Sequence, residues 1–307
     1  MLAFFKGSRM NVIELKDLNL VYNSSGFQIG PKFNLAIQQG DFVGLVGESG
    51  CGKSSLGKVL IGLINQDERE NFGIRSLSGD LNFHIPLNKK GINYLDTSYK
   101  NLQELRRDVQ MIFQNPRSAL NLKMPVISTL MEAAKIGNPN LDKASLLKII
   151  YEKVIRTQFL NSNVSFDDFL KEKKILASNG SLSGGERRRV SIAKVMCMNP
   201  SIIIADEPLA SLDASIKLDI LNYIKEEWKE RQKSNNPLTL ILISHDIGVV
   251  SNVCNRVIIM FGDLINKNGK IVEEFNAPRK FKLEVNKNYH EYTNELIEAS
   301  KYFSSGD

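Results

Sequence analysis

Residues 41–64 read DFVGLVGESGCGKSSLGKVLIGLI, and this stretch decides the fold. Apolar residues dominate 41–47, a glycine-rich loop follows at 47–54, and apolar residues then recur with helical spacing over 54–64. A buried strand, a glycine loop and a helix in this order are the setting that a phosphate-binding loop requires. The stretch therefore predicts an α/β fold that holds a phosphate group at the start of a helix.

The loop fits the pattern G-x-x-x-x-G-K-[ST]. Its glycines let the backbone wrap closely around an anion, and the N–H groups and dipole of the following helix favour negative charge. Lys53 is expected to reach the β- and γ-phosphates of a nucleotide, and the Ser54 hydroxyl is expected to ligate Mg²⁺. The predicted nucleotide-binding residues of the loop are Gly47, Ser49, Gly50, Cys51, Gly52, Lys53, Ser54 and Ser55.

Two short, continuous apolar runs are typical of strands buried on both faces of a parallel sheet: IIIADEP at 202–208 and LTLILISHD at 238–246. The segment between them has a helix predicted at about 214–232, as in a right-handed crossover. Asp206 ends the first run, where its carboxylate is placed to hold Mg²⁺. Glu207 follows and can polarise an attacking water as general base.

The segment SLSGGERRRVS at 181–191 has no obvious purpose inside a single folded domain. It makes sense as a helix N-terminus that presents its backbone N–H groups to a nucleotide held by another subunit. Ser183, Gly184 and Gly185 would open that helix, and its dipole would favour a γ-phosphate. The chain is thus predicted to be half of a nucleotide-driven clamp.

With these motifs in this order, the chain resembles the nucleotide-binding subunit of an ATP-binding cassette (ABC) transporter over nearly all of residues 11–265. The resemblance implies a P-loop NTPase (RecA-like) fold: a mixed, mostly parallel sheet, an antiparallel β subdomain and an inserted α-helical subdomain at about 118–185. It places an ABC ATPase domain at 11–270 and a C-terminal tail at 271–307. In the family, two subunits pair head to tail and close over two ATP molecules.

The resemblance also assigns roles to single residues. Tyr22 matches the aromatic that stacks on adenine, and Asp213 lies in the SLD loop that crosses the dimer interface. The residues implied in hydrolysis are Glu207, the switch histidine His245 and the glutamine Gln114. The implied Mg²⁺ ligands are Ser54, Gln114 and Asp206. The residues implied to meet ATP across the pair are Ser183, Gly184, Gly185, Glu186 and Asp213.

Within the family, local features resemble the oligopeptide, dipeptide and nickel importer branch. These are VGESGCGKSS, the segment VQMIFQNPRSALN at 109–121, and a tail that pairs KIVEEF (270–275) with HEYTNELIEAS (290–300). The chain departs from the branch pattern at Leu122 and Glu291, where proline is usual. No cysteine follows Cys254, so the iron–sulfur cluster of some branch members is not expected.

Composition is compatible with this reading. The 307 residues are 42% hydrophobic and 24% charged, with a net charge of +6 and dispersed lysines, and they contain three unpaired cysteines. No apolar run approaches the roughly 20 residues that span a bilayer, and residues 1–10 show no secretory signal. The expected partners are a second ABC ATPase subunit, integral membrane permease subunits and, indirectly, an extracytoplasmic substrate-binding protein, with no nucleic acid. The expected location is the cytoplasmic face of the cell membrane.

Other functions fit the residues less well. A soluble ABC ATPase acting on ribosomes or nucleic acid is the main alternative, although such proteins usually carry two cassettes or a long coiled coil. An exporter subunit would leave the tail unexplained. A catalytically inert subunit is disfavoured by the intact Glu207 and LSGGE motif. We therefore expect an ATP-binding and ATP-hydrolysing subunit of an importer for peptides, or for nickel or metal chelates.

Overall fold

A computed structural model of the protein describes residues 10–84, 92–210, 212–234, 237–263, 265–277, 284–286 and 288–304. The chain divides into two compact units. The first unit is Met1–Leu105 with Pro237–Asp307, and the second is Arg106–Asn236. Residues 1–9, for which no secretory signal is expected, and Ser211 of the predicted interface loop lie outside the described residues.

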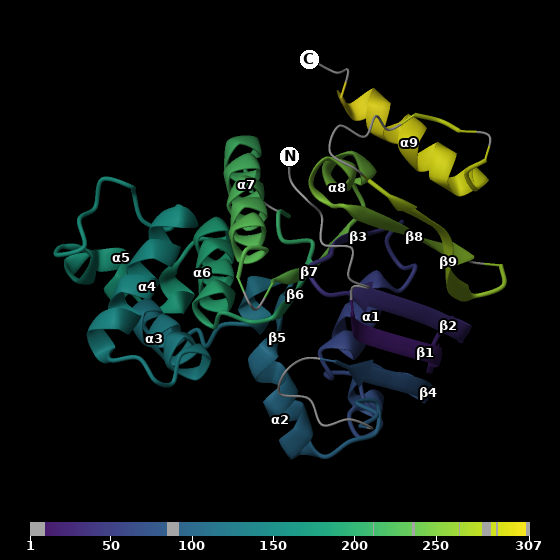
Figure 1. The fold of residues 1–307 in the computed structure, drawn as a ribbon, viewed down its shortest axis with the longest axis horizontal. Coiled ribbons are helices and arrows are strands. Elements are labelled where there is room, and N and C mark those ends of the chain that lie inside the picture. Colours follow the sequence, from purple (N-terminus) through teal and green to yellow (C-terminus); the bar gives the residue numbers. More distant parts are fainter. Residues whose placement is uncertain are drawn as a thin grey trace. The chain divides into compact units, whose positions relative to one another are not determined.

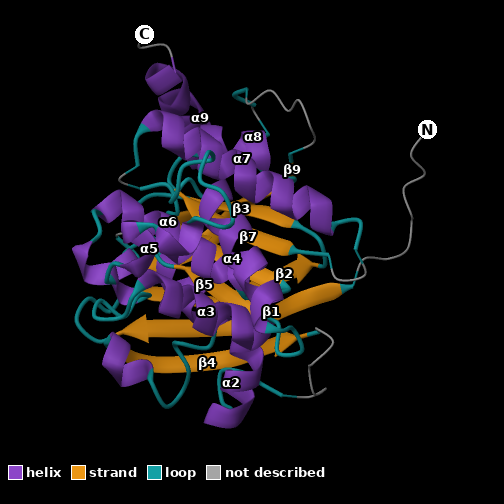
Figure 2. Ribbon diagram, turned by 90° about the vertical axis from the view of Figure 1, so that its left-hand side faces the viewer, coloured by secondary structure: helices purple, strands orange, loops and turns teal. Residues whose placement is uncertain are grey.

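The first unit is built on strands that follow the order β4-β1-β2-β9-β8-β3-β7 (Figures 1 and 2). The strands are β1 (Asn11–Tyr22), β2 (Gln28–Gln38), β3 (Phe42–Val46), β4 (Ile74–Phe83), β7 (Thr239–Ser244), β8 (Arg256–Asp263) and β9 (Asn268–Asn276). The helices are α1 (Lys53–Leu60), the 3₁₀ helix η1 (Arg69–Phe72), α8 (Ile247–Val253) and α9 (Glu291–Ser304). Helix α2 (Tyr99–Asp108) crosses from this unit into the second.

The central strands of the first unit are parallel, and two of them are fully buried. Strand β3 pairs with β7 on one side and β8 on the other, and every residue of β3 and β7 is buried. These strands are the continuous apolar runs at 41–47 and 238–246. Their composition follows from burial on both faces, where no position is left to solvent.

The segment at 65–107 is polar but has a strand-like piece, LNFHI at 81–85, and it contains strand β4 of the sheet. Strand β4 pairs antiparallel with β1, and Figure 2 shows the two side by side. Ile74, Leu77, Leu81 and Phe83 are buried on it, while the residues between them are mostly exposed or half-buried. One face of this strand is therefore buried in the unit, and polar residues occupy the other face.

The tail segment YTNELIEASKY (292–302) predicts a helix, and α9 includes it. In Figure 1 this helix, in yellow, lies beside α8, against which it packs. Tyr292, Thr293 and Ile297 are buried on its inner face. The tail is therefore a packed part of the first unit.

The second unit combines a parallel strand pair with a group of helices. Strands β5 (Val109–Ile112) and β6 (Ile202–Asp206) pair in parallel. The α-helices are α3 (Val126–Gly137), α4 (Lys143–Arg156), α5 (Lys173–Leu176), α6 (Gly184–Cys197) and α7 (Ala214–Arg231). The 3₁₀ helices are η2 (Pro116–Ser118), η3 (Phe169–Lys171) and η4 (Asn179–Ser181).

One apolar cluster holds α3 to α6 together, and these helices lie close to one another in Figure 1. Leu130, Ile150 and Phe169 are fully buried in it. Truncating any one of them to alanine is expected to cost about 2–5 kcal/mol of folding stability. Helix α7 is joined to α4 by the Lys153–Glu227 ion pair at 3.1 Å. The helix that carries LSGGE is thus part of the core of this unit.

Candidate functional site

The phosphate loop follows β3 and ends at α1, and its backbone leaves no room for side chains at two glycines. A Cβ on Gly47 would lie 2.1 Å from the carbonyl oxygen of Met260. Gly52 has φ 104°, a conformation that favours glycine, and it caps α1 without any side-chain cap. A helix start without a side-chain cap offers its backbone N–H groups to an anion.

Lys53 is folded into this loop. Its side chain is buried, and its Nζ donates hydrogen bonds to the carbonyl oxygens of Gly47 at 2.6 Å and Glu48 at 2.7 Å. An ammonium group in this position gives the loop a concentrated positive charge. The arrangement suits a polyanion such as a nucleotide phosphate chain.

The floor of the loop is made by two strands from elsewhere in the chain. A Cβ on Gly262 of β8 would meet Cys51 at 2.9 Å, and one on Gly269 of β9 would meet the Cys51 carbonyl oxygen at 2.4 Å. Burial raises the pKa of the Cys51 thiol, which disfavours the thiolate form. The sequence reading missed both glycines, although an isolated glycine in a strand signals close backbone approach.

Tyr22 and His245 also lie in the first unit. The Tyr22 hydroxyl shares a hydrogen bond with the Ser55 hydroxyl, so the end of β1 reaches the first turn of α1. His245 is exposed and directly follows β7. Because Val46 pairs with Ser244 in the parallel register, the phosphate loop and His245 leave the sheet at the same edge. Tyr22 therefore lies beside the start of α1, and His245 lies at the same edge of the sheet as the loop.

The second unit gathers Gln114, Asp206 and Glu207. Ile112 pairs with Ala205 in the parallel register of β5 and β6, so all three leave these strands at one edge. Asp206 is buried, whereas Glu207 is half-buried and has φ 45°. A left-handed conformation in a residue other than glycine costs of order 1–3 kcal/mol and often marks a functional position.

Arg188 of α6 lies beside Gln114, Asp206 and Glu207. It was not predicted from the sequence. Its buried guanidinium donates to the carbonyl oxygen of Phe113 at 2.7 Å and to that of Gln114. Burial lowers the pKa of Arg188, and the nearby charges of Asp206 and Glu207 act in the opposite direction. A signal was present, because Arg188 stands one turn before Ile192 on the buried face of the helix.

Helix α6 begins with a capping box. The Ser183 hydroxyl accepts from the Glu186 N–H at 3.2 Å, and the Glu186 carboxylate accepts from the Ser183 N–H at 2.9 Å. The sequence predicted a free N–H on Ser183. In the structure this N–H is bonded, because the Glu186 side chain reaches back to it. Lys174 lies 2.7 Å from the same carboxylate.

Gly184 and Gly185 are the first helical residues of α6, and Gly184 is exposed. A Cβ on Gly185 would lie 3.7 Å from the Leu212 side chain, so the segment leading into α7 lies beside the start of α6. Asp213 caps α7 from an exposed position without a side-chain cap bond. The surface at the start of α6 thus includes the end of the predicted interface loop.

The predicted residues fall into two groups, one in each unit. The first unit carries Tyr22, His245 and the loop residues Gly47, Ser49, Gly50, Cys51, Gly52, Lys53, Ser54 and Ser55. The second unit carries Gln114, Ser183, Gly184, Gly185, Glu186, Asp206, Glu207 and Asp213. Within the described residues, no cluster of three or more His, Cys, Asp or Glu side chains forms a metal site. The predicted Mg²⁺ donors are hydroxyl, amide and carboxylate oxygens, which are the ligand types that a hard cation prefers.

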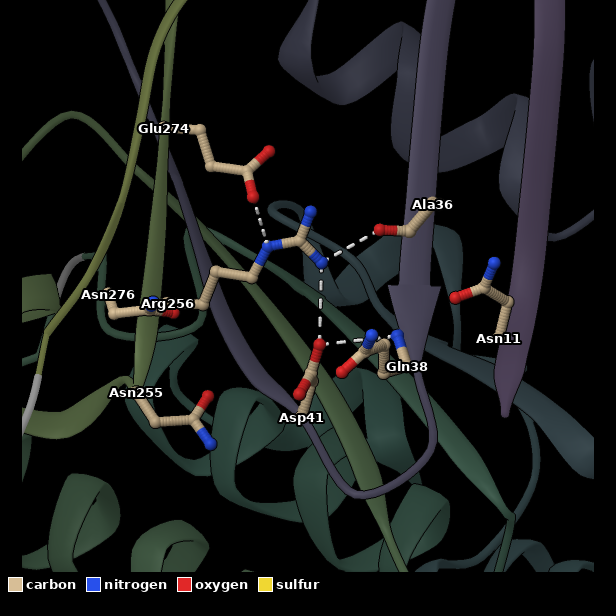
Figure 3. A pocket seen from close by; sticks show the side chains of 8 residues that line it. All are labelled: Asn11, Ala36, Gln38, Asp41, Asn255, Arg256, Glu274 and Asn276. Atoms are coloured by element: carbon tan, nitrogen blue, oxygen red, sulfur yellow. Dashed lines mark hydrogen bonds and ion pairs between the residues drawn. The ribbon is translucent and has the colours of Figure 1, made fainter. Parts of the chain in front are cut away.

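A polar pocket of about 510 Å³ lies at the other end of β3 (Figure 3). Arg256 bridges it, donating to Glu274 at 2.8 Å, to the Ala36 carbonyl oxygen at 2.7 Å and to Asp41 at 3.4 Å. Asp41 and Arg256 stand at the amino-terminal ends of their strands, whereas ligands of parallel sheets bind at the carboxyl ends. We interpret the pocket as structural: within it, the contacts of Arg256 link neighbouring strands.

Comparison with known proteins agrees with this geometry. The family described as ABC transporter matches residues 31–210 of the chain. The oligopeptide transport ATP-binding protein OppF of Bacillus subtilis is 33% identical over 263 residues, which cover 86% of this chain and 73% of that protein. OppF of Haemophilus influenzae is 30% identical over 260 residues, covering 85% of this chain and 66% of that protein. The chain therefore spans just under two thirds of the length of the Haemophilus relative.

A solved structure shares the fold. It is a dimeric ATP-binding cassette in a post-hydrolysis state, bound to ADP and Pi, with a TM-score of 0.65 and 21% sequence identity. The match covers 86% of this chain and 98% of that chain. In the part of the chain that the structure describes, no helix is both long and apolar enough to cross a membrane.

Proposed function

The chain belongs to the ABC transporter family, and we propose that it is the ATP-binding and ATP-hydrolysing subunit of an importer for oligopeptides. The observation that carries the proposal is the phosphate loop, with the buried Lys53 ammonium held against the Gly47 and Glu48 carbonyl oxygens. The substrate class rests on the relatives named OppF.

In this proposal, the first unit supplies the nucleotide-binding groups. Lys53 and the N–H groups at the start of α1 bind the phosphates, and the ring of Tyr22 stacks on adenine. Ser54 would be the ligand of this unit for bound Mg²⁺, which would neutralise charge on the β- and γ-phosphates; Gln114 and Asp206 are the ligands proposed from the second unit. His245, exposed at the same sheet edge as the loop, would contact the γ-phosphate.

The second unit would supply the hydrolytic base. Glu207 polarises the attacking water, and its strained backbone holds the carboxylate at the end of β6. Arg188 has a positioning role, because it fixes the backbone of Gln114 and faces the charges of Asp206 and Glu207. The start of α6 would meet the nucleotide of a partner ATPase subunit when ATP closes the pair.

Replacing Glu207 with glutamine tests the hydrolytic step. ATP binding should persist, while phosphate release by the assembled complex should fall by at least about a hundredfold, because general-base catalysis contributes 10²–10⁴. Size-exclusion chromatography in ATP should then show the closed pair accumulating. The matched control is Glu226→Gln on the exposed side of α7. Turnover at the wild-type rate in Glu207→Gln would exclude Glu207 as the base.

Affinity purification from native membranes in mild detergent tests the importer assignment. Mass spectrometry should find multi-span permease subunits together with a substrate-binding protein, as expected for a subunit attached to the cytoplasmic face of the cell membrane. Peptide-loaded binding protein should stimulate ATP hydrolysis by this complex more than nickel chelates do. Ribosomal proteins or nucleic acid without permease subunits would contradict the importer and favour the soluble alternative.

A further inference from the structure

A hydrogen bond joins the tail helix α9 to the phosphate loop. The Tyr292 hydroxyl accepts from the backbone N–H of Glu48 at 2.7 Å, and these residues are 244 positions apart in the chain. We propose that Tyr292 is a positioning residue for the phosphate loop, so that nucleotide affinity depends on the docked tail. This inference rests on the proposed function, because it concerns how tightly the same loop holds ATP.

The bond acts on the peptide group that also holds Lys53. The N–H of Glu48 and the carbonyl of Gly47 belong to one peptide group, which is planar and rigid. Tyr292 holds the N–H, and the Lys53 ammonium donates to the Gly47 carbonyl oxygen at 2.6 Å. Fixing the direction of the N–H therefore fixes the direction of the carbonyl and with it the resting position of Lys53.

Tyr292 is itself held by packing that does not depend on this bond. Its side chain is buried, and its ring lies 4.9 Å from the ring of Phe261 on β8. The preceding His290 N–H donates to the Glu273 carboxylate of β9 at 2.7 Å. Burial raises the pKa of Tyr292 to about 12, so its hydroxyl stays uncharged at neutral pH. The tail thus presents a fixed acceptor to the loop.

Part of the phosphate loop is weakly restrained by packing. Glu48, Ser49 and Gly50 are exposed, so few packing contacts restrain this part of the backbone. An anion site binds tightly only when its donors are already in place, because ordering them on binding costs affinity. Tyr292 supplies that order from outside the motif.

Tyr292→Phe in the full chain removes the acceptor and keeps the ring. Isothermal titration should show affinity for ATP and ADP reduced by about five- to tenfold, the loss expected for one hydrogen bond. In the assembled complex, KM for ATP should rise while kcat stays near the wild-type value. Tyr289→Phe is the matched control, because Tyr289 belongs to the same tail and its ring stacks on Phe275 at 5.5 Å. Its nucleotide affinity should equal that of wild type.

Lys53→Ala, titrated in parallel, separates the two proposals. If wild type binds ATP no better than Lys53→Ala, the ATP-binding function itself fails. If Lys53→Ala weakens binding and Tyr292→Phe binds as tightly as wild type, or more tightly, the positioning role fails alone. Amide hydrogen exchange in wild type gives a second test that needs no variant. The Glu48 N–H should be protected although its side chain is exposed, and rapid exchange would overturn the inference.

Discussion

Helices α1 and α6 both start at glycine-rich segments, yet their first turns are built in opposite ways. The start of α1 has Gly52 as its cap, no side-chain cap bond and no acidic residue in its first turn. The start of α6 has Ser183 as its cap, and the Glu186 carboxylate completes a capping box. The first turn of α1 has no side-chain cap bond, whereas in α6 the Ser183 and Glu186 side chains accept from two backbone N–H groups.

The difference indicates how the two sites bind. Lys53 adds positive charge to the end of α1 that already favours anions, whereas Glu186 adds negative charge at the corresponding end of α6. The first site is therefore able to hold a phosphate on its own. The second carries a carboxylate, paired with Lys174, where the first carries an ammonium, in keeping with the proposal that it meets a nucleotide already bound to a partner subunit.

Lys53→Ala should have the largest effect on this comparison. It removes the buried ammonium of the strong site, and ATP affinity of the full chain should fall by at least about a hundredfold, or about 3 kcal/mol. Isothermal titration measures the change. Lys58→Ala, at the far end of the same helix, is the control and should bind normally. If Lys53→Ala and Lys58→Ala bind ATP with equal affinity, the start of α1 is not the stronger anion site that we infer.

Arg188→Ala should have the next largest effect, on stability. The variant leaves the carbonyl oxygens of Phe113 and Gln114 without this donor and Asp206 without a neighbouring positive charge. The free energy of unfolding in urea should fall by about 2–3 kcal/mol. Arg117→Ala provides an exposed reference. A loss as small as that of the reference would mean that α6 is positioned by its apolar face alone.

Alanine at one glycine of each helix start should have effects of opposite sign. At Gly52, φ 104° and the Ile29 side chain 2.7 Å from a new Cβ make the change destabilising, by about 1–2 kcal/mol. At Gly184 a new Cβ meets nothing within 4 Å, and helix propensity favours alanine by about 0.5–1 kcal/mol. Thermal unfolding of both variants measures the contrast. Two shifts of the same sign would contradict the opposite constructions inferred here.

Glu186→Gln should have the smallest effect, and a pH dependence identifies it. The Lys174 side chain and the Ser183 N–H lower the pKa of Glu186 from 4.5 to about 2. A folded-state pKa below the unfolded value stabilises the fold above pH 4.5, and this contribution is lost as the pH falls towards 2. The free energy of unfolding of wild type should exceed that of the variant by about 0.5 kcal/mol at neutral pH, because the Glu186–Lys174 pair is partly exposed to solvent. Urea unfolding at pH 7 and pH 3 should show this gap shrinking, and a constant gap would exclude the charge as its source.

Local pattern was enough to predict much of this chain. The resemblance to an ABC ATPase subunit of the oligopeptide importer branch is confirmed by the family match and by the OppF relatives. The α/β cassette fold is confirmed by the shared architecture of a solved ATP-binding cassette. The domain boundaries at 270 and 271, and the roles given to single residues, stay predictions.

The features that the sequence by itself determined depend on residues that are close to one another along the chain. Strands β3 and β7, the phosphate loop and the helices α1, α7 and α9 follow from apolar runs, glycines and helical spacing within a few residues. The tertiary structure alone decided which distant groups meet: Tyr292 with Glu48, Gly269 with Cys51, and Arg188 with Gln114. The physical reason is that local propensities depend on adjacent residues, whereas these contacts exist only after the chain has closed loops of many residues, and no short pattern records the partner.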